Sequence, residues 1–385
     1  MLDFAFYNPT RIFLGRGKIA LLGQKIPADA RVLVLYGGGS AERNGVLDEV
    51  RAALGERRVG EFGGIEPNPV YETLLQAVER VREHGADFLL AVGGGSIIDG
   101  CKFVAVAARY AGDPWEILSG RGQTIRSALP FATVLTLPAT GSEMNSGAVV
   151  TRRSMQAKLS FKSEWVFPQF SILDPEKTFS LPPRQVANGI VDTFVHVLEQ
   201  YLTYPVGATV QDRLAEALLL TLVEAGPRAL AEPADYDVRA NLMWCASLAL
   251  NGLLACGVPR DWATHMLGHE LTALHGIDHA RTLAVVLPAM LRVRREEKRA
   301  KLLQYGARIW GCTEGDEDRR IEEAIARTEA FFTALGLPTR LGAYRIGAEH
   351  IDALIGQLTA HEMVALGEHG TVTPEMSRQV FLSAL

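Results

Sequence analysis

Four of the nine histidines of this chain lie between residues 265 and 279. His265 and His269 are four residues apart in a segment with helical periodicity, and Asp192 and His196 have the same spacing in a second such segment. Residues four apart on a helix share one face. Imidazoles beside a carboxylate are ligands that divalent transition metals prefer. The two segments therefore predict a metal site.

Spacing alone does not assign every ligand of this site. Gly276 is expected to end the helix that carries His265, which places His279 in the next turn or at the start of another helix. The choice among His269, His275 and His279 stays open at this point. His269-Glu270 with His275 resembles a metalloprotease motif. That motif needs its second histidine four residues after the first, and here the separation is six, so a metallohydrolase is disfavoured.

Two Gly-Gly-Gly-Ser turns follow short apolar segments near the N-terminus. The turns comprise Gly37, Gly38, Gly39 and Ser40 in the first, and Gly93, Gly94, Gly95 and Ser96 in the second. A glycine-rich turn between a strand and a helix lets the backbone approach an anion. Either turn alone is weak evidence, but two at the carboxyl ends of parallel strands favour a nucleotide site. Asp99, just inside the second helix, would accept hydrogen bonds from a ribose or cap the helix.

The first turn bears on the choice between NAD(H) and NADP(H). An acidic residue at the end of this strand usually holds the 2′-hydroxyl of the NAD ribose. Residues 37–40 contain no acid, and Ser40 and Arg43 would accommodate a 2′-phosphate. The turn therefore predicts NADP(H) rather than NAD(H).

The elements that carry these residues change in character along the chain. Arg31–Tyr36, Asp87–Val92 and Ala132–Leu137 are apolar strand candidates that alternate with helical segments such as Tyr71–His84, which predicts a parallel sheet covered on both faces. After Leu181, long amphipathic segments dominate. The predicted fold class is α/β, with a Rossmann-like NADP-binding domain at 1–180 and an all-α domain at 181–385 for the metal and the substrate. The helices expected in the second domain are Arg184–Thr203, Asp212–Ala225, Val238–Gly252, Trp262–His275 and Arg320–Leu335.

Composition narrows the class of protein further. A chain of 385 residues is long enough for two domains. The net charge of −5, without a basic stripe, argues against a nucleic-acid partner. The four cysteines form no C-x-x-C pair, which suits a reducing compartment. We find no signal-peptide pattern at the N-terminus and no apolar stretch long enough for a membrane, so we expect a cytoplasmic protein.

The motifs GGGSIIDGCK, PATGSE, GIVDTFVH, HMLGHEL and GIDH together resemble the iron-containing (group III, metal-dependent) alcohol dehydrogenase family. The similarity is greatest to the butanol dehydrogenase and NADPH-dependent aldehyde reductase type, and it runs from NPTRIFLG to the C-terminal segment. The resemblance implies a dehydroquinate synthase-like fold and a homodimer. It also implies hydride transfer between NADP(H) and a short- to medium-chain primary alcohol or aldehyde.

The resemblance also implies roles for individual residues. It implies one divalent metal, Fe2+ or Zn2+, held by Asp192, His196, His265 and His279. His269 would lie beside the metal or on the substrate side, near the nicotinamide, without binding the ion; its role would be to support the ligands or to relay a proton. The implied cofactor contacts are the two glycine turns (Gly37 to Ser40 and Gly93 to Ser96) together with Asp99, Thr136, Thr140, Asn145 and Lys158.

Other functions compete with this interpretation. They are an NAD-linked polyol dehydrogenase of the glycerol type, a synthase on the same fold, and a nucleotide- and metal-binding protein without turnover. A synthase would need several basic residues for a phosphorylated substrate. The residues after position 240 that could line a substrate pocket are mostly apolar, and Arg260 is the one basic residue among them. This composition favours an uncharged alkyl substrate. These apolar candidates are Met243, Trp244, Leu248, Leu253, Leu254 and Trp262.

Overall fold

The computed structural model describes all 385 residues and divides into two compact units. The α/β unit comprises Tyr7–Leu181 and Ala234–Ser247. The helical unit comprises Met1–Phe6, Pro182–Pro233 and Leu248–Leu385. None of the helices combines the length and the apolar character that crossing a membrane requires.

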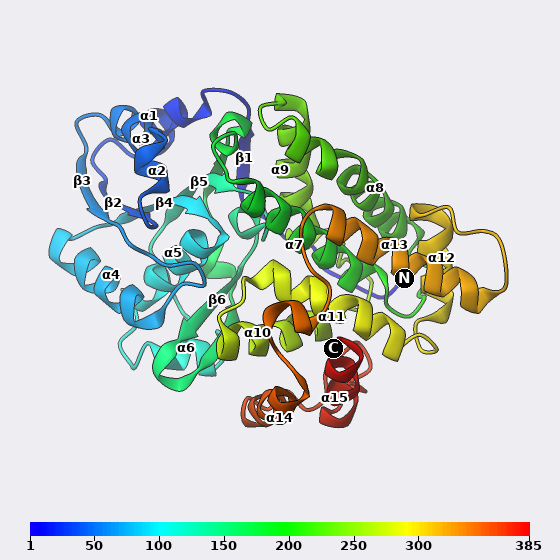
Figure 1. Cartoon of the computed structure of the whole chain (residues 1–385). Helices are drawn as coiled ribbons and strands as arrows, with labels where there is room; N and C mark the ends of the chain where they lie inside the picture. The colour runs from blue at the N-terminus through cyan, green and yellow to red at the C-terminus, as the bar shows by residue number, and fades with distance from the viewer. The chain divides into compact units, whose positions relative to one another are not determined.

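The α/β unit is built on a six-stranded sheet in the order β1-β8-β5-β4-β2-β3, in which every neighbouring pair is parallel (Figure 1). Its strands are β1 (Arg11–Leu14), β2 (Arg31–Tyr36), β3 (Arg58–Phe62), β4 (Phe88–Gly94), β5 (Phe131–Leu137) and β8 (Phe170–Leu173). Its helices of four or more residues are α1 (Leu22–Lys25), α2 (Ser40–Arg43), α3 (Val46–Leu54), α4 (Tyr71–His84), α5 (Gly95–Ala107), α6 (Trp115–Ser119) and most of α9 (Tyr236–Leu250), with the 3-10 turns Lys18–Leu21 and Pro175–Thr178.

Alternate side chains of the central strands pack on opposite faces of this sheet. Leu33 and Leu35 of β2 belong to the apolar core that α4 and α5 cover. Val32 and Val34 belong to the core that α1 and α3 cover. Strands buried on both faces are apolar at every position, which explains why the run RVLVLY shows no alternation. The prediction of a parallel sheet with helices on both faces is confirmed.

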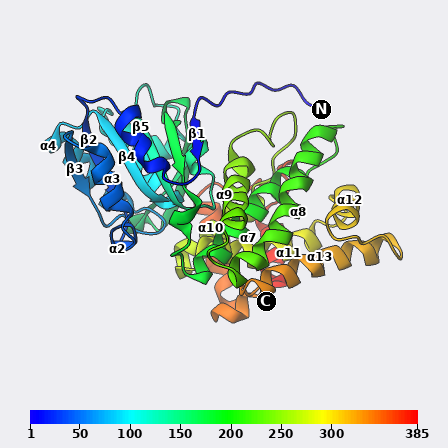
Figure 2. The same cartoon turned by 90° about the horizontal axis from the view of Figure 1, so that it is seen from above.

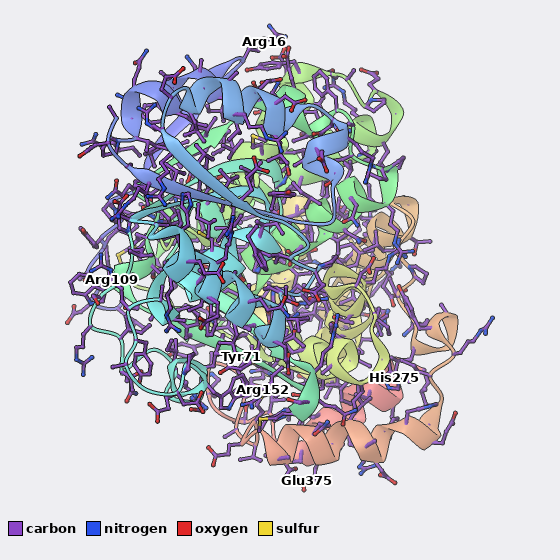
Figure 3. The ribbon with its side chains drawn as sticks, turned by 90° about the vertical axis from the view of Figure 1, so that its left-hand side faces the viewer. Arg16, Tyr71, Arg109, Arg152, His275 and Glu375 are labelled. Carbon is purple, nitrogen blue, oxygen red and sulfur yellow. The ribbon has the colours of Figure 1, made fainter.

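A separate antiparallel hairpin, β6 (Gly147–Arg152) and β7 (Ala157–Lys162), follows the sheet strand β5 in sequence. Its end is held by the guanidinium of Arg152, which lies 5.0 Å from the ring centroid of Tyr71 and 4.8 Å from that of Trp115 (Figure 3). The hydroxyl of Tyr71 in turn donates to Asp113. The hairpin was not predicted from the sequence; β6 packs against α4 and β7 against α6, contacts that local sequence does not show.

The helical unit packs long helices against one another. They are α7 (Pro183–Tyr201), α8 (Thr209–Ala231), α10 (Ala263–His275), α11 (His279–Val293), α12 (Arg299–Ile309), α13 (Glu317–Ala334), α14 (Ile351–Ala360) and α15 (Pro374–Ser383). α7 lies beside α8 and α11, and α12 lies beside α13, as Figures 1 and 2 both show. α10, α11, α14 and α15 share one apolar core. The central helices α7 and α11 are therefore surrounded by other helices.

Several predicted elements match the structure closely. β2 and α4 have the predicted bounds, and α10 ends before Gly276, which has the left-handed φ of 67°. Strands β1, β3 and β8 and helices α11, α12, α14 and α15 were not predicted. The part of α9 from its first residue, Tyr236, to Ser247 belongs to the α/β unit, and Met243 is fully buried in the core of that unit.

Candidate metal centre and nucleotide-binding turns

Three helices of the helical unit bring a carboxylate and three imidazoles together. Asp192 and His196 lie one turn apart on α7, His265 lies near the start of α10, and His279 is the first residue of α11. Asp192 Oδ1 is 3.6 Å from His196 Nδ1, 3.9 Å from His265 Nε2 and 3.7 Å from His279 Nε2. Ligand atoms of Asp192, His265 and His279 all lie within 4.8 Å of one another.

These distances suit a shared cation. Ligands bound at 2.0–2.2 Å in a tetrahedral site are roughly 3.4 Å apart, close to the separations found here. His196 Nδ1 and His265 Nε2 are buried nitrogen atoms without a hydrogen-bond partner. Asp192 Oδ1 is beyond hydrogen-bond distance from both nitrogens, at 3.6 Å and 3.9 Å. Buried polar atoms normally have partners, so the pair of unsatisfied nitrogens fits a metal.

The two buried histidines differ in protonation. Burial, only partly opposed by Asp192, lowers the pKa of His196 to about 4. Burial also acts to lower the pKa of His265, but Glu199 and Asp192 outweigh it and raise that pKa to about 9. A neutral imidazole is the metal-binding form. His196 is ready to bind, whereas a metal entering the site displaces a proton from His265.

Sequence reasoning missed Glu199, which contacts His265 Nδ1 through one carboxylate oxygen. Its other oxygen accepts a hydrogen bond from the backbone N–H of Thr264 at 2.7 Å. Asp192, His196 and Glu199 follow an i, i+4, i+7 spacing on α7, which places all three on one face. This spacing was the available signal.

The structure distinguishes His269, His275 and His279, among which spacing could not choose a metal ligand. The His269 ring lies 5.2 Å from the His279 ring and 6.5 Å from the His265 ring, beside the cluster. His275, at the end of α10 (Figure 3), lies 5.2 Å from the His350 ring instead, and burial lowers its pKa. His279 is thus the histidine that joins Asp192 and His265.

Of the apolar residues predicted to line the substrate pocket, some are buried in the core and one lies beside the metal cluster. Met243 and Leu254 are buried in packed apolar surroundings. Trp262 is different, because its ring lies 5.4 Å from the His265 ring and 6.2 Å from the His196 ring. Trp262 also has a left-handed φ of 62°, rare for a large side chain.

Both glycine segments stand at the carboxyl edge of the sheet, after β2 and at the end of its neighbour β4. The second is not the separate turn that was predicted, because Gly93 and Gly94 end β4 and Gly95 and Ser96 begin α5 directly. Helix α3, which follows β2, packs on one face of the sheet, and α5, which follows β4, packs on the other. This divergence defines a switch point, where ligands bind in open parallel sheets. The structure therefore gives the two turns a common location that the sequence could only suggest.

The glycines of the two turns are required for different reasons. A Cβ on Gly93 would stand 2.4 Å from Ile97 Cγ1, one on Gly94 would stand 2.9 Å from Leu137 Cβ, and one on Gly95 would stand 2.3 Å from Thr140 Oγ1. These three are needed for packing. Gly38 is exposed, has no left-handed φ, and a Cβ there would have no atom within 4 Å. Neither packing nor backbone conformation explains Gly38, so it leaves an open cradle of the kind that a nucleotide needs.

Asp99 does not cap α5, contrary to one of the two roles considered for it. Its carboxylate accepts hydrogen bonds from Ser142 Oγ at 2.5 Å and from the Val149 N–H at 2.9 Å. Burial raises the pKa of Asp99, against the attraction of Lys102. The Lys102 ammonium is fully buried, and this burial lowers its pKa to about 8. Asp99 and Lys102 therefore join α5 to the segment after β5.

The remaining cofactor candidates surround this network. Lys102 Nζ donates to Ser142 Oγ, to Asn145 Oδ1 and to the Gly147 carbonyl, at 2.7–2.8 Å. Thr140 Oγ1 accepts from the Ser142 N–H at 3.2 Å, and Thr136 is buried at the end of β5. Elsewhere, Lys158 Nζ donates to Asn68 Oδ1 at 3.1 Å, and Ser96 Oγ accepts from the Asn68 N–H. Lys102 and Ser142 were not among the predicted residues.

A unit built on a parallel sheet with glycine turns at its switch point, and a second, helical unit with a buried carboxylate and imidazole cluster, are together typical of metal-dependent dehydrogenases. The model of the iron-containing alcohol dehydrogenase family matches residues 9–175, and its C-terminal counterpart matches residues 186–382. The chain belongs to the iron-containing alcohol dehydrogenase family. This confirms the resemblance, the fold class and the prediction of an oxidoreductase.

Individual relatives extend over the whole chain. It is 58% identical to the NADPH-dependent aldehyde reductase YqhD of Escherichia coli (strain K12), with 100% of both proteins aligned. It is 38% identical to NADH-dependent butanol dehydrogenase A of Clostridium acetobutylicum, with 99% of each covered. The crystal structure of YqhD from E. coli K-12 superposes with a TM-score of 0.99 at 57% identity, over 100% of this chain and 99% of that one.

Proposed function

We propose that this protein reduces short- to medium-chain aldehydes with NADPH and oxidises the corresponding primary alcohols in the reverse direction. The observation that carries the proposal is the buried Asp192, His265 and His279 cluster in a chain so similar to an NADPH-dependent aldehyde reductase. Asp192, His196, His265 and His279 would hold one Fe2+ or Zn2+ ion. A divalent ion held there supplies Lewis-acid polarisation of a carbonyl oxygen, and NADPH supplies the hydride.

The side chains around the cluster have their own roles in this proposal. The Trp262 ring would form an apolar wall beside the ligands and exclude water from the aldehyde. An imidazole nitrogen of His269, beside His279, would deliver the proton that the product oxygen needs. Glycine turns at the switch point would hold the pyrophosphate. The remaining proposed cofactor contacts are Asp99, Thr136, Thr140, Asn145 and Lys158.

The preference for NADPH needs support of its own, since relatives include NADH-dependent enzymes. Arg43 Nη1 lies 3.1 Å from the place where a Cβ on Gly39 would stand, so its guanidinium covers the first turn. The Glu42 carboxylate lies 4.0 Å from the same place. A 2′-phosphate there would pair with Arg43 and be repelled by Glu42. The hydroxyl of Ser40 would offer the phosphate a further donor.

We further propose a cytoplasmic homodimer with a nucleotide-binding domain at 1–180 and a metal- and substrate-binding domain at 181–385. Four buried cysteines without disulfides support a reducing compartment. Light scattering coupled to size-exclusion chromatography tests the dimer, which a monomeric mass would refute.

The test of the reaction is oxidation of NADPH and of NADH with butanal, before and after chelation, and then with Zn2+ or Fe2+ restored. We expect metal-restored activity that prefers NADPH. His265→Ala should lose metal and activity together, whereas His269→Ala should keep metal and lose rate. NADPH binding without turnover under any metal would refute the reductase and favour a protein that only binds nucleotide and metal.

A further inference from the structure

We propose that Glu199 is a positioning residue that holds His265 in the one orientation and tautomer able to bind the metal. This inference rests on the metal site of the proposed function. It concerns a residue that would touch neither the ion nor the substrate. Its evidence is the set of contacts that surrounds the Glu199 carboxylate.

The contacts of His265 leave only one nitrogen for a metal. Its Nδ1 contacts a Glu199 carboxylate oxygen, while its Nε2 faces Asp192 Oδ1 at 3.9 Å. A carboxylate accepts hydrogen bonds and donates none, so Nδ1 carries the hydrogen. When a metal displaces the second proton of His265, the lone pair is therefore on Nε2, on the side of Asp192 and His279. Histidine ligands are commonly oriented in this way by a carboxylate on the opposite ring nitrogen.

Glu199 is itself held so that it cannot turn away. Its side chain is 2% exposed, and its second oxygen accepts the Thr264 N–H at 2.7 Å. Its backbone carbonyl accepts the Asp261 N–H at 2.9 Å. The Asp261 carboxylate accepts the Ala263 N–H and pairs with Arg294 at 2.6 Å. These bonds fix the segment before α10 against α7, and with it the ring of His265.

The Thr264 N–H makes the role testable by a nearly isosteric change. In Glu199→Gln, the amide oxygen must take the Thr264 N–H, because two donors cannot face each other. The amide NH2 then points at His265 Nδ1 and forces that nitrogen to become the acceptor. The hydrogen moves to Nε2 and blocks the metal position. The Gln variant is thus more damaging than removal of the side chain, which frees either tautomer.

The experiment measures metal affinity of the full chain, with Zn2+ and Co2+ as probes competed against a chromophoric chelator. We expect Glu199→Ala to weaken binding about 10- to 100-fold, and Glu199→Gln to weaken it more. A role limited to packing would give the opposite order, because alanine leaves a cavity and glutamine does not. Thermal melting of the metal-free variants records any loss of stability separately.

Glu216 offers a matched control. It is another buried carboxylate of the helical unit, on α8, and it accepts hydrogen bonds from Tyr201 and pairs with Arg213. Glu216→Gln should lower the melting temperature and bind metal as the wild type does. Wild-type affinity in either Glu199 variant overturns the inference. A wild-type chain that binds no metal refutes the proposed site itself, and the inference with it.

Discussion

Gly38→Ala should raise the stability of the metal- and nucleotide-free protein and weaken nucleotide binding. The new methyl group would meet no atom within 4 Å, and the backbone at Gly38 has no left-handed φ. Replacing a glycine whose conformation alanine can adopt stabilises a protein by about 0.4–1 kcal/mol, because the unfolded chain loses freedom. The same methyl group would occupy the cradle where the backbone approaches the pyrophosphate.

The expected loss of affinity follows from crowding. An extra methyl group in a packed contact costs about 1–3 kcal/mol, which is roughly a 5- to 150-fold increase in Kd. Calorimetric titration with NADPH measures this change, and urea denaturation measures the stability. Substitutions at two other glycines serve as controls for Gly38→Ala. Gly93→Ala, whose Cβ would stand 2.4 Å from Ile97 Cγ1, should destabilise by about 1–3 kcal/mol. Gly356→Ala, in the open interior of α14, should stabilise without changing NADPH affinity.

Gly38→Ala should raise the free energy of unfolding and lower the affinity for NADPH, so each measurement can refute a different part of the prediction. If Gly38→Ala binds NADPH as tightly as the wild type, the cradle is not the nucleotide site and the first turn has another role. If it destabilises the protein as Gly93→Ala does, then Gly38 is a packing glycine and the argument from open space is wrong.

Further predictions concern charged side chains of the α/β unit. Arg43→Ala should raise KM for NADPH at least tenfold with little change in KM for NADH. Glu42→Ala should lower KM for NADPH. Equal effects of either change on the two cofactors would contradict the placement of the 2′-phosphate beside Arg43. Burial lowers the pKa of Lys102 to about 8, below its ordinary value. Between that pH and about 10.4 the unfolded chain binds the additional proton, so stability should rise with pH by up to about 1.4 kcal/mol per unit. Urea denaturation at pH 8 and 9.5 should show this rise in stability in the wild type and not in Lys102→Met. Equal changes in stability in the two proteins would show that the pKa of Lys102 is not lowered.

Local sequence was sufficient for elements whose pattern is decided by their own residues. The run from Tyr71 to His84 repeats apolar side chains at helical spacing, and α4 has those bounds. The continuous apolar run of β2 has no periodicity, yet its short length and the glycines that follow it were enough to predict a strand. Strands β1 and β8 lacked such signals. They are short, and they form because the edge of an existing sheet offers them partners.

The sequence by itself determined the chemistry available to this protein: a carboxylate with imidazoles at helical spacing, and two glycine turns after apolar strands. Tertiary structure decided which of these residues meet. Asp192 and His265 are far apart in sequence and come together only because α7 and α10 pack around α11, which begins at His279. The same packing sends His275 to His350 and brings Glu199 to His265. Spacing along one helix shows which side chains share a face, but contacts between helices depend on how the apolar faces of the whole unit pack.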